Sequence, residues 1–531
     1  MIKALLIFIS VLLLISPAST QWQPGRIHIP DSLIMEGYNV AAKNNVLASI
    51  NPKVFFGYFS VCADGLGYGY GNTYPSLDGH QMSDALLWLG QTDIVKANWS
   101  YVKSFQKPTG ELPIAILPAE AGKEVGLVGY LSRVDSNGGL YRHWVPGDPL
   151  RVLGPTTYIQ NADIIFRFTQ DMEWLKEQIF SINLCADYLS SLVSAEGLVG
   201  GAGYYVERPT RIEYDGVSQC FATDAFFRVA ALNRRIGEKK EARKYEKLAE
   251  KIRRNFQNGF WISDHFAEYI HPDSGIISRH GYTDSDWTAL ATGMANRKQK
   301  FLLWQQLEKE KRFYYGGMPT GIATNPEKYE NWEFSYPDRQ ELAAMGRVWY
   351  TEAWARASMD DATGLIETLH LVCKKGKENG WYWRERYNSE GGYGADKYNE
   401  YPANLIRIVQ RFLLGLDIRV DGTVTIFPKV PEAYWEKGFG QTLAWNDNAL
   451  SYEMKKDYII GTYTGSSTQH LCVQLCTPDS WTKRKRARIT INGIPSRGTV
   501  RKGKLHLILP AASEDKPCYF QAEKINNENK P

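Results

Sequence analysis

One change in periodicity divides this 531-residue chain and constrains its fold more than any other feature. From about residue 30 to 416, apolar residues recur at the spacing of amphipathic helices. After about residue 417, short runs rich in Val, Ile and Thr follow one another, as strands do. We therefore expect a mainly α domain over 21–416 and a small antiparallel β-sandwich over 417–531.

The helical part contains eleven candidate helices between residues 34 and 416. The clearest runs from Ser218 to Ile236, where Gly237 follows as a natural C-cap. The next, over 238–256, carries apolar residues on one stripe and charged residues on the other. Long loops rich in Gly and aromatic residues join the helices at 62–78, 200–216, 312–338 and 380–400. Loops of this length in a compact domain are usually functional.

The tail after residue 417 carries strand-like runs with turn residues between them. The runs cover 423–426, 458–463, 471–475, 488–492 and 505–509, and Asn492-Gly493 is a hairpin signal. These signals predict a module of about 100 residues built from antiparallel strands.

The first twenty residues have the pattern of a secretory signal peptide. Lys3 gives a positive start, 4–16 is an apolar run, and 16–20 offers small residues for cleavage. The apolar run is short for a membrane span. The mature chain is therefore expected to be secreted or periplasmic, with no membrane insertion after signal cleavage.

Charge and motif content exclude several functions. Lys and Arg number 62 against 58 Asp and Glu, and this near balance makes nucleic acid a poor partner. No phosphate-binding loop, dinucleotide fingerprint or zinc spacing is present, so no cofactor or metal is expected. Bound calcium stays open, because loop carboxylates bind it without a motif. The 16 Trp, 31 Tyr and 21 Phe fill a core or line a cleft for sugars, and composition does not choose between these.

Two loops hold carboxylates suited to glycoside hydrolysis. An inverting enzyme needs one carboxyl group that protonates the leaving oxygen and another that activates water. In the loop 200–216, Glu207 beside Tyr205 is the predicted acid, and Arg211 is a predicted substrate-binding residue. Glu213 and Asp215 stay open as alternative acids, although Asp215 also suits the N-cap of the next helix.

The second loop, 381–394, precedes the last helix of the helical region. Glu385 lies between Arg384 and Arg386, which favour its ionised form, so Glu385 is the predicted general base. A purely structural ion pair is the alternative. Arg384 is a predicted substrate-binding residue.

Further residues are expected to line the cleft. Asp78 and His80 open an early helix, Asp286 and Trp287 open a later one, and Trp332 adds aromatic surface. Capping is the alternative for Asp78, a satisfied buried ring for His80, and a place in the core for each tryptophan.

These segments resemble a clan of (α/α)6 glycosidases that includes α-L-rhamnosidases, trehalases and the mannosyl-oligosaccharide glucosidases. Residues 207–209 are similar to the acid loop of the clan, and 385–388 with 391–392 to its base segment. The passage 414–431 into the tail is also similar. The resemblance implies an (α/α)6 toroid followed by a β-sandwich, and an Asp78 that binds sugar hydroxyls. The acidic Asp-x-x-x-Arg loop of the rhamnosidases and the large β domains that precede their barrel are absent from the sequence.

The expected function is a secreted, exo-acting, inverting glycoside hydrolase. It would remove a terminal sugar from a plant or host oligosaccharide, as α-L-rhamnosidases do. One alternative is a polysaccharide lyase that recruits Tyr205, His143 and Arg211. The other is a non-catalytic glycan-binding protein. The oligomeric state stays open.

Overall fold

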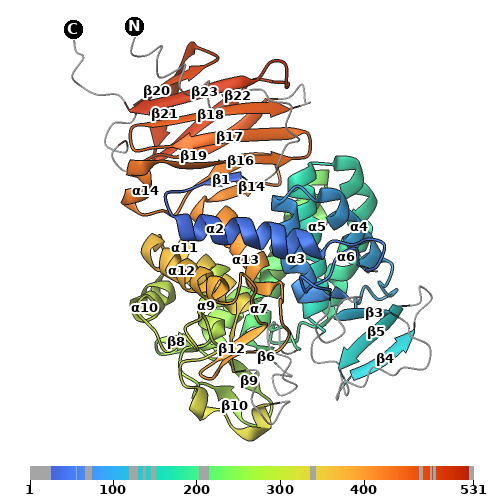
Figure 1. The fold of residues 1–531 in the computed structure, drawn as a ribbon. Helices are drawn as coiled ribbons and strands as arrows, with labels where there is room; N and C mark the ends of the chain where they lie inside the picture. The colour runs from blue at the N-terminus through green and yellow to red at the C-terminus, as the bar shows by residue number, and fades with distance from the viewer. Residues whose placement is uncertain are drawn as a thin grey trace.

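The fold has a helical body and a large sheet at one end of it (Figure 1). The structure is a computed structural model that describes residues 26–55, 57–65, 74–118, 130–134, 139–144, 151–201, 214–334, 342–465, 470–478, 481 and 486–524. It combines helices with several sheets, so it is mixed rather than mainly α. Parts of the segments that the sequence analysis treated as loops form small sheets, which contributes to this difference.

Six helices with many buried residues form the inside of the helical body. Each packs against the next in chain order, and the last packs against the first, so the contacts run in a cyclic order. All thirteen residues of the first are buried, as an inner position requires. The six are α3 (Ser76–Trp88), α5 (Leu153–Thr169), α7 (Gly216–Ile236), α9 (Asp284–Ala291), α11 (Gly346–Ser358) and α13 (Glu400–Ile408).

A second set of helices alternates with the first along the chain. In α8, Ala242, Tyr245 and Ala249 lie on the buried stripe, and Lys, Arg and Glu fill the rest, as the sequence predicts. One-sided burial of this kind is typical of an outer helix. The set comprises α2 (Ser32–Val40), α4 (Thr92–Lys103), α6 (Met172–Ser191), α8 (Lys239–Gly259), α10 (Arg297–Leu307) and α12 (Ala362–Glu378). Helix α2 continues into the π-helix η1 (Ala41–Val46) and the 3-10 helix η2 (Leu47–Ser49), and α13 continues into the π-helix η6 (Val409–Leu413).

The ends of α7 show why the helix lies where the sequence placed it. The Asp215 carboxylate accepts a hydrogen bond from the Ser218 N–H at 2.7 Å, which caps the first turn. Gly237 closes the other end at φ 92°, a left-handed conformation that favours glycine. Asp215 therefore marks the start of α7, and Gly237 marks its end.

Two-residue strands come directly before three of the inner helices. β2 (Tyr74–Pro75) precedes α3, β6 (Tyr214–Asp215) precedes α7, and β11 (Ala344–Met345) precedes α11. Each belongs to a small sheet, so these sheets brace the loops at the N-terminal ends of the inner helices. In Figure 1 the labelled strands of these sheets lie away from the large sheet. The other strands of this group are β3 (Ala115–Pro118), β4 (Tyr130–Val134), β5 (Gly139–Trp144), β9 (Tyr269–His271), β10 (Gly275–Ile277), β12 (Arg386–Asn388) and β13 (Gly391–Tyr393), and β7 (Trp261–Ile262) pairs with β8 (His265–Phe266).

The large sheet has the strand order β1-β16-β17-β18-β23-β20-β21-β22-β19-β15-β14. Neighbouring strands are antiparallel except β15 and β19, which are parallel. The edge strand β1 comes from the start of the described chain and pairs with β16, which ties the two ends of the chain together. The strands are β1 (Arg26–His28), β14 (Leu416–Ile418), β15 (Val424–Ile426), β16 (Phe439–Trp445), β17 (Asn448–Met454), β18 (Tyr458–Gly465), β19 (Leu471–Cys476), β20 (Arg486–Ile491), β21 (Ile494–Arg501), β22 (Lys504–Leu509) and β23 (Cys518–Lys524), and α14 (Glu432–Lys437) precedes β16.

The predicted hairpin at Asn492-Gly493 is confirmed. The two residues join β20 to β21 with φ values of 52° and 76°, as a tight turn between antiparallel strands requires.

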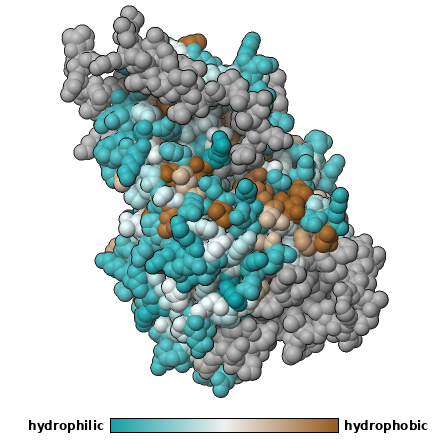
Figure 2. Space-filling view, viewed as in Figure 1, coloured by the Kyte–Doolittle hydropathy of each residue, from teal (hydrophilic) through white to brown (hydrophobic). Residues whose placement is uncertain are grey.

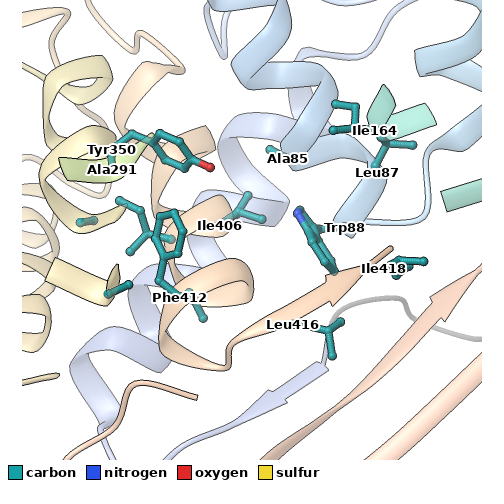
Figure 3. Close-up of a cluster of buried hydrophobic side chains, with 14 of the residues drawn as sticks. Ala85, Leu87, Trp88, Ile164, Ala291, Tyr350, Ile406, Phe412, Leu416 and Ile418 are labelled. Carbon is teal, nitrogen blue, oxygen red and sulfur yellow. The ribbon is translucent and has the colours of Figure 1, made fainter. Parts of the chain in front are cut away.

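A continuous hydrophobic core joins the helical body to the sheet. Trp88 of α3, Phe412 of η6, and Leu416 and Ile418 of β14 belong to the same cluster (Figure 3). The visible surface is largely hydrophilic, with apolar residues in a band across the middle of the view (Figure 2). Among the described residues, no helix has both the length and the hydropathy needed to cross a membrane.

Candidate active site

Three buried charged residues meet at the N-terminal ends of α3, α11 and α13. The Arg347 guanidinium contacts Glu400 through Nε, 3.0 Å from each carboxylate oxygen, and through Nη2 at 2.7 Å. The Arg347 backbone N–H also donates to Glu400. Asp78 has a long contact of 3.5 Å with Arg347 Nη2 and a side-chain hydrogen bond with Tyr398. Arg347 therefore pairs more closely with Glu400 than with Asp78.

The longer contact of Asp78 with Arg347 shows in its proton affinity. Burial raises the pKa of Asp78 to about 7, the Arg347 charge opposes this, and the negative charges of Glu400 and Glu385 add to it. A carboxyl group with a pKa near neutrality holds a proton that it can give up, which is the property of a general acid.

Glu385 lies on the loop that leads into β12 and is buried. Its Oε1 pairs with Arg386 Nη2 at 3.1 Å, and its Oε2 accepts a hydrogen bond from the Ala395 N–H at 3.4 Å. The predicted ion pair with an arginine thus exists, and it holds the carboxylate in place. Because the Glu385 charge raises the pKa of Asp78, the two groups lie close enough to interact.

The pKa of the Cys62 thiol also responds to Asp78 and Glu385. Burial raises the pKa of the Cys62 thiol, and the charges of Asp64, Asp78 and Glu385 raise it further. The Cys62 thiol and these three carboxyl groups therefore belong to one region of mutual electrostatic influence.

The predicted substrate-binding residue Arg384 neighbours Glu385 but points to another partner. Its Nε pairs with Asp396 Oδ1 at 2.7 Å, and its side chain is about half-exposed. Arg384 is thus accessible at the edge of this region, on the same loop as Glu385.

His80 faces the axis of the inner helices one turn along α3. Its Nδ1 hydrogen-bonds Asn161 Oδ1 at 2.7 Å, and its Nε2 lies 3.4 Å from Arg407 Nη2. Burial lowers the pKa of His80 to about 3, so the ring stays neutral and Nε2 accepts from Arg407. The partners correspond to the satisfied buried ring that the sequence left open for His80.

Asp286 and Trp287 have structural partners in the core. The Asp286 carboxylate accepts from the backbone N–H groups of Thr283 at 2.9 Å and Phe266 at 2.8 Å, completing a capping box. Trp287 is fully buried and makes an edge contact with Phe313, with ring centroids 5.6 Å apart. A fully buried indole offers no face to a sugar, because its surroundings already cover it.

Trp332 is the exposed aromatic of the predicted set. It lies in the turn η5 (Asn331–Glu333), 38% exposed, beside His271 and with the Arg279 guanidinium 5.7 Å from its ring. An indole in this position has a face available for stacking.

The predicted acid Glu207, together with Tyr205, Arg211 and Glu213, lies outside the described residues. Asp215 is described, and as the cap of α7 its carboxylate serves the helix start. For the lyase alternative, the backbone of His143 lies in β5.

Sequence reasoning missed Arg347 and Glu400. They are 53 positions apart, and each stands alone in its segment, so no local pattern connects them. A weak signal existed, since each is a charged residue in the first turn of its helix.

A buried histidine between two glutamates braces the loops near β9 and β10. His280 contacts Glu268 through Nδ1 and Glu333 through Nε2, the latter at 3.1 Å. Tyr329 stacks on the His280 ring with centroids 3.5 Å apart. Both ring nitrogens of His280 have carboxylate partners and its face is covered by Tyr329, so this cluster is a structural support beside η5. The described residues hold no group of three or more His, Cys, Asp or Glu side chains placed to bind a metal ion.

Comparison with solved structures identifies the fold. The chain superposes on a GH78-family rhamnosidase of Bacillus sp. GL1 with a TM-score of 0.60 and 11% identity, covering 85% of this chain and 41% of that one. The α-L-rhamnosidase of Dictyoglomus thermophilum gives 0.59 and 10%, covering 94% and 50%. That of Streptomyces avermitilis, complexed with L-rhamnose, gives 0.53 and 11%, covering 94% and 42%. No family model and no curated protein matches the sequence.

The predicted resemblance to α-L-rhamnosidases is thus confirmed as a structural similarity. At this identity the similarity shows the fold, which is shared with glycoside hydrolases. The chain spans half or less of the length of the three rhamnosidases.

Proposed function

We propose that the protein is an exported, exo-acting, inverting glycoside hydrolase built on an (α/α)6 toroid. The cyclic contacts of the six inner helices support the toroid, and the rhamnosidase fold supports a sugar substrate. One observation carries the proposal. A buried carboxyl group with a pKa of about 7, Asp78, interacts with a second buried carboxylate, Glu385, at the loop end of the inner helices.

The two carboxyl groups divide the work of hydrolysis. Glu385 is the general base and takes a proton from the water that attacks the anomeric carbon. Asp78 in its protonated form is the general acid and gives its proton to the glycosidic oxygen as the bond to that carbon breaks. Arg347 stays paired with Glu400 and keeps the proton affinity of Asp78 from rising further.

Glu207 remains the acid that the sequence predicts, and it competes with Asp78 for this role. The proposed substrate is an oligosaccharide with a terminal sugar such as L-rhamnose. Export rests on the pattern of residues 1–20, and N-terminal sequencing of the protein recovered outside the cytoplasm tests it.

Sugar release from a panel of plant and host oligosaccharides tests the activity. Chromatography should find one saturated monosaccharide, and proton NMR of early product should show an inverted anomer. An ultraviolet-absorbing product would instead identify a lyase. Binding without any product would support the glycan-binding alternative.

Matched variants then assign the roles. Glu385→Gln should lower kcat by about 10²–10⁴ on every substrate, because water must be activated in each case. An acid variant should lose most on poor leaving groups and least on aryl glycosides whose leaving group needs no proton. Asp78→Asn should show this pattern and Glu207→Gln should not, with the exposed Glu308→Gln as control. The reverse result would return the acid role to Glu207.

A further inference from the structure

A cavity of about 260 Å³ lies among the inner helices and runs from Leu77 and Arg347, near their N-terminal ends, to Arg411 and Leu416. Its walls include Ile164 of α5, Tyr350 of α11, Phe412 of η6 and Leu416 of β14, which Figure 3 shows around a common centre. Arg347 reaches its inner end from the Asp78 cluster. The cavity therefore begins beside the Asp78 carboxyl group and extends away from it along α3, past Gln81 to Asp84.

Exposure along the cavity locates its mouth. The side chains of Arg228, Arg167 and Asp417 are 22%, 21% and 41% exposed, whereas Asp84 is 2% exposed. Gln81 is equally buried. Solvent therefore reaches the cavity beside β14, and Gln81 and Asp84 lie deeper inside it.

Carboxylates hold the arginines of the cavity in fixed positions. Asp84 accepts from Arg407 Nε at 2.7 Å and from Arg411 through Nε at 2.9 Å and Nη2 at 2.6 Å. Arg228 donates through Nε to Asp224 at 2.6 Å and through Nη1 to Asp163. Carboxylates thus hold one edge of each guanidinium in place before a ligand arrives. Binding therefore does not have to order these arginine side chains, which would cost conformational entropy.

Two hydrogen-bond donors of the cavity, one on Gln81 and one on Arg228, are not used by the described residues. Gln81 Nε2 is buried and has no hydrogen-bond partner among the described residues, while its Oε1 accepts from Asn404. Arg228 Nη2 has none in that part of the chain either. Both oxygens of Asp84 are already occupied by arginines. A buried donor without a partner is costly, so the cavity is built for something that brings acceptors.

We propose that this axial cavity binds a monosaccharide-sized carboxylate. The carboxylate would accept from Gln81 Nε2 and Arg228 Nη2, and the apolar rings of Tyr350 and Phe412 would cover the body of the ligand. Arg407 stacks on the Tyr350 ring at 3.7 Å and fixes that wall. Binding at this site does not depend on the proposed hydrolytic activity.

D-Glucuronate and D-glucose form a matched pair of probes, because they differ in the carboxylate alone. Isothermal titration at low salt should detect glucuronate binding to the full chain, with glucose at least ten-fold weaker. Binding should persist in Glu385→Gln, which separates it from the proposed general base. Equal binding of both sugars, or no glucuronate binding, would overturn the proposal, as would sulfate binding without glucuronate binding.

Gln81→Glu tests the site itself, because it keeps the shape and the Oε1 acceptor but replaces the unpaired donor by a negative charge. It should weaken glucuronate binding at least ten-fold, whereas Gln305→Glu makes the same charge change on the exposed face of α10 and should not. If Gln81→Glu does not fold, Arg228→Lys serves as the second variant. It keeps the positive charge but removes the planar guanidinium with its Nη2 donor, and it should weaken glucuronate binding. Unchanged binding in a folded variant of either kind contradicts the site.

Discussion

Asp78 and Asp84 are both buried on the same helix, α3, and their pKa values are shifted in opposite directions. Burial raises the pKa of Asp78 to about 7. Burial also acts on Asp84, but Arg411 and Arg407 outweigh it and hold the pKa of Asp84 well below its usual range. The difference teaches that the number of committed arginines, rather than depth of burial, decides which carboxyl group can carry a proton at neutral pH.

The largest effect should follow from removing the charge of Asp84. Asp84→Asn leaves Arg407 and Arg411 buried without their carboxylate and should lower the free energy of unfolding by about 3–5 kcal/mol. Asp78→Asn is the matched control and should change it by less than about 1 kcal/mol at pH 4, where the folded chain holds Asp78 protonated. Urea unfolding measures both. Equal losses would break the comparison between the two aspartates.

The pH dependence of stability should separate the two aspartates next. Unfolded Asp78 ionises near its ordinary pKa of 3.8, whereas in the folded chain it keeps its proton up to about 7. Its contribution to stability is therefore present below pH 4 and is lost as pH rises toward 7. Relative to Asp78→Asn, the wild type should lose about 2–4 kcal/mol over this range. A flat difference between pH 4 and 8 would contradict the raised pKa.

The rate of hydrolysis should depend on the protonation of the Asp78 carboxyl group. If the protonated form of Asp78 is the acid, kcat/KM should fall about ten-fold per pH unit above about 7. The measurement is a pH–rate profile on a glycoside with a poor leaving group. In Asp78→Asn this descending limb should disappear, and its persistence would assign it to another residue.

The smallest effect concerns His80, which lies between Asp78 and Asp84 on α3. Burial lowers its pKa to about 3, so its ring should show no titration between pH 5 and 8 in NMR spectra, in contrast to a free histidine near 6.5. A His80 signal that titrates in this range would mean that solvent or a counter-charge reaches the axis.

Local signals in the sequence predicted much of the fold. The stripe of α8, the cap residues of α7 and the Asn492-Gly493 turn are decided by neighbours within a few positions, so periodicity and turn chemistry identify them. The pairing of β1 with β16 depends on residues more than 400 positions apart, and no local pattern encodes it.

Some residues of the candidate site could likewise be predicted from local sequence, and others could not. The acidic residues Asp78 and Glu385 could be found, because each lies in or beside an aromatic, Gly-rich loop. The clamp between Arg347 and Glu400 could not, since both partners come from separate helices. Composition likewise could not tell the buried Trp287 from the exposed Trp332, because exposure is set by packing.

The protonation of Asp78 tests the central claim most directly. Infrared spectra of the wild type minus Asp78→Asn should show the band of a protonated carboxyl at pH 6 that disappears with a midpoint near 7. Asp84→Asn should show no such difference. A midpoint near 4 for Asp78 would mean that this carboxyl is ionised at neutral pH, and the assignment of a proton donor at the loop end of the helices would be wrong.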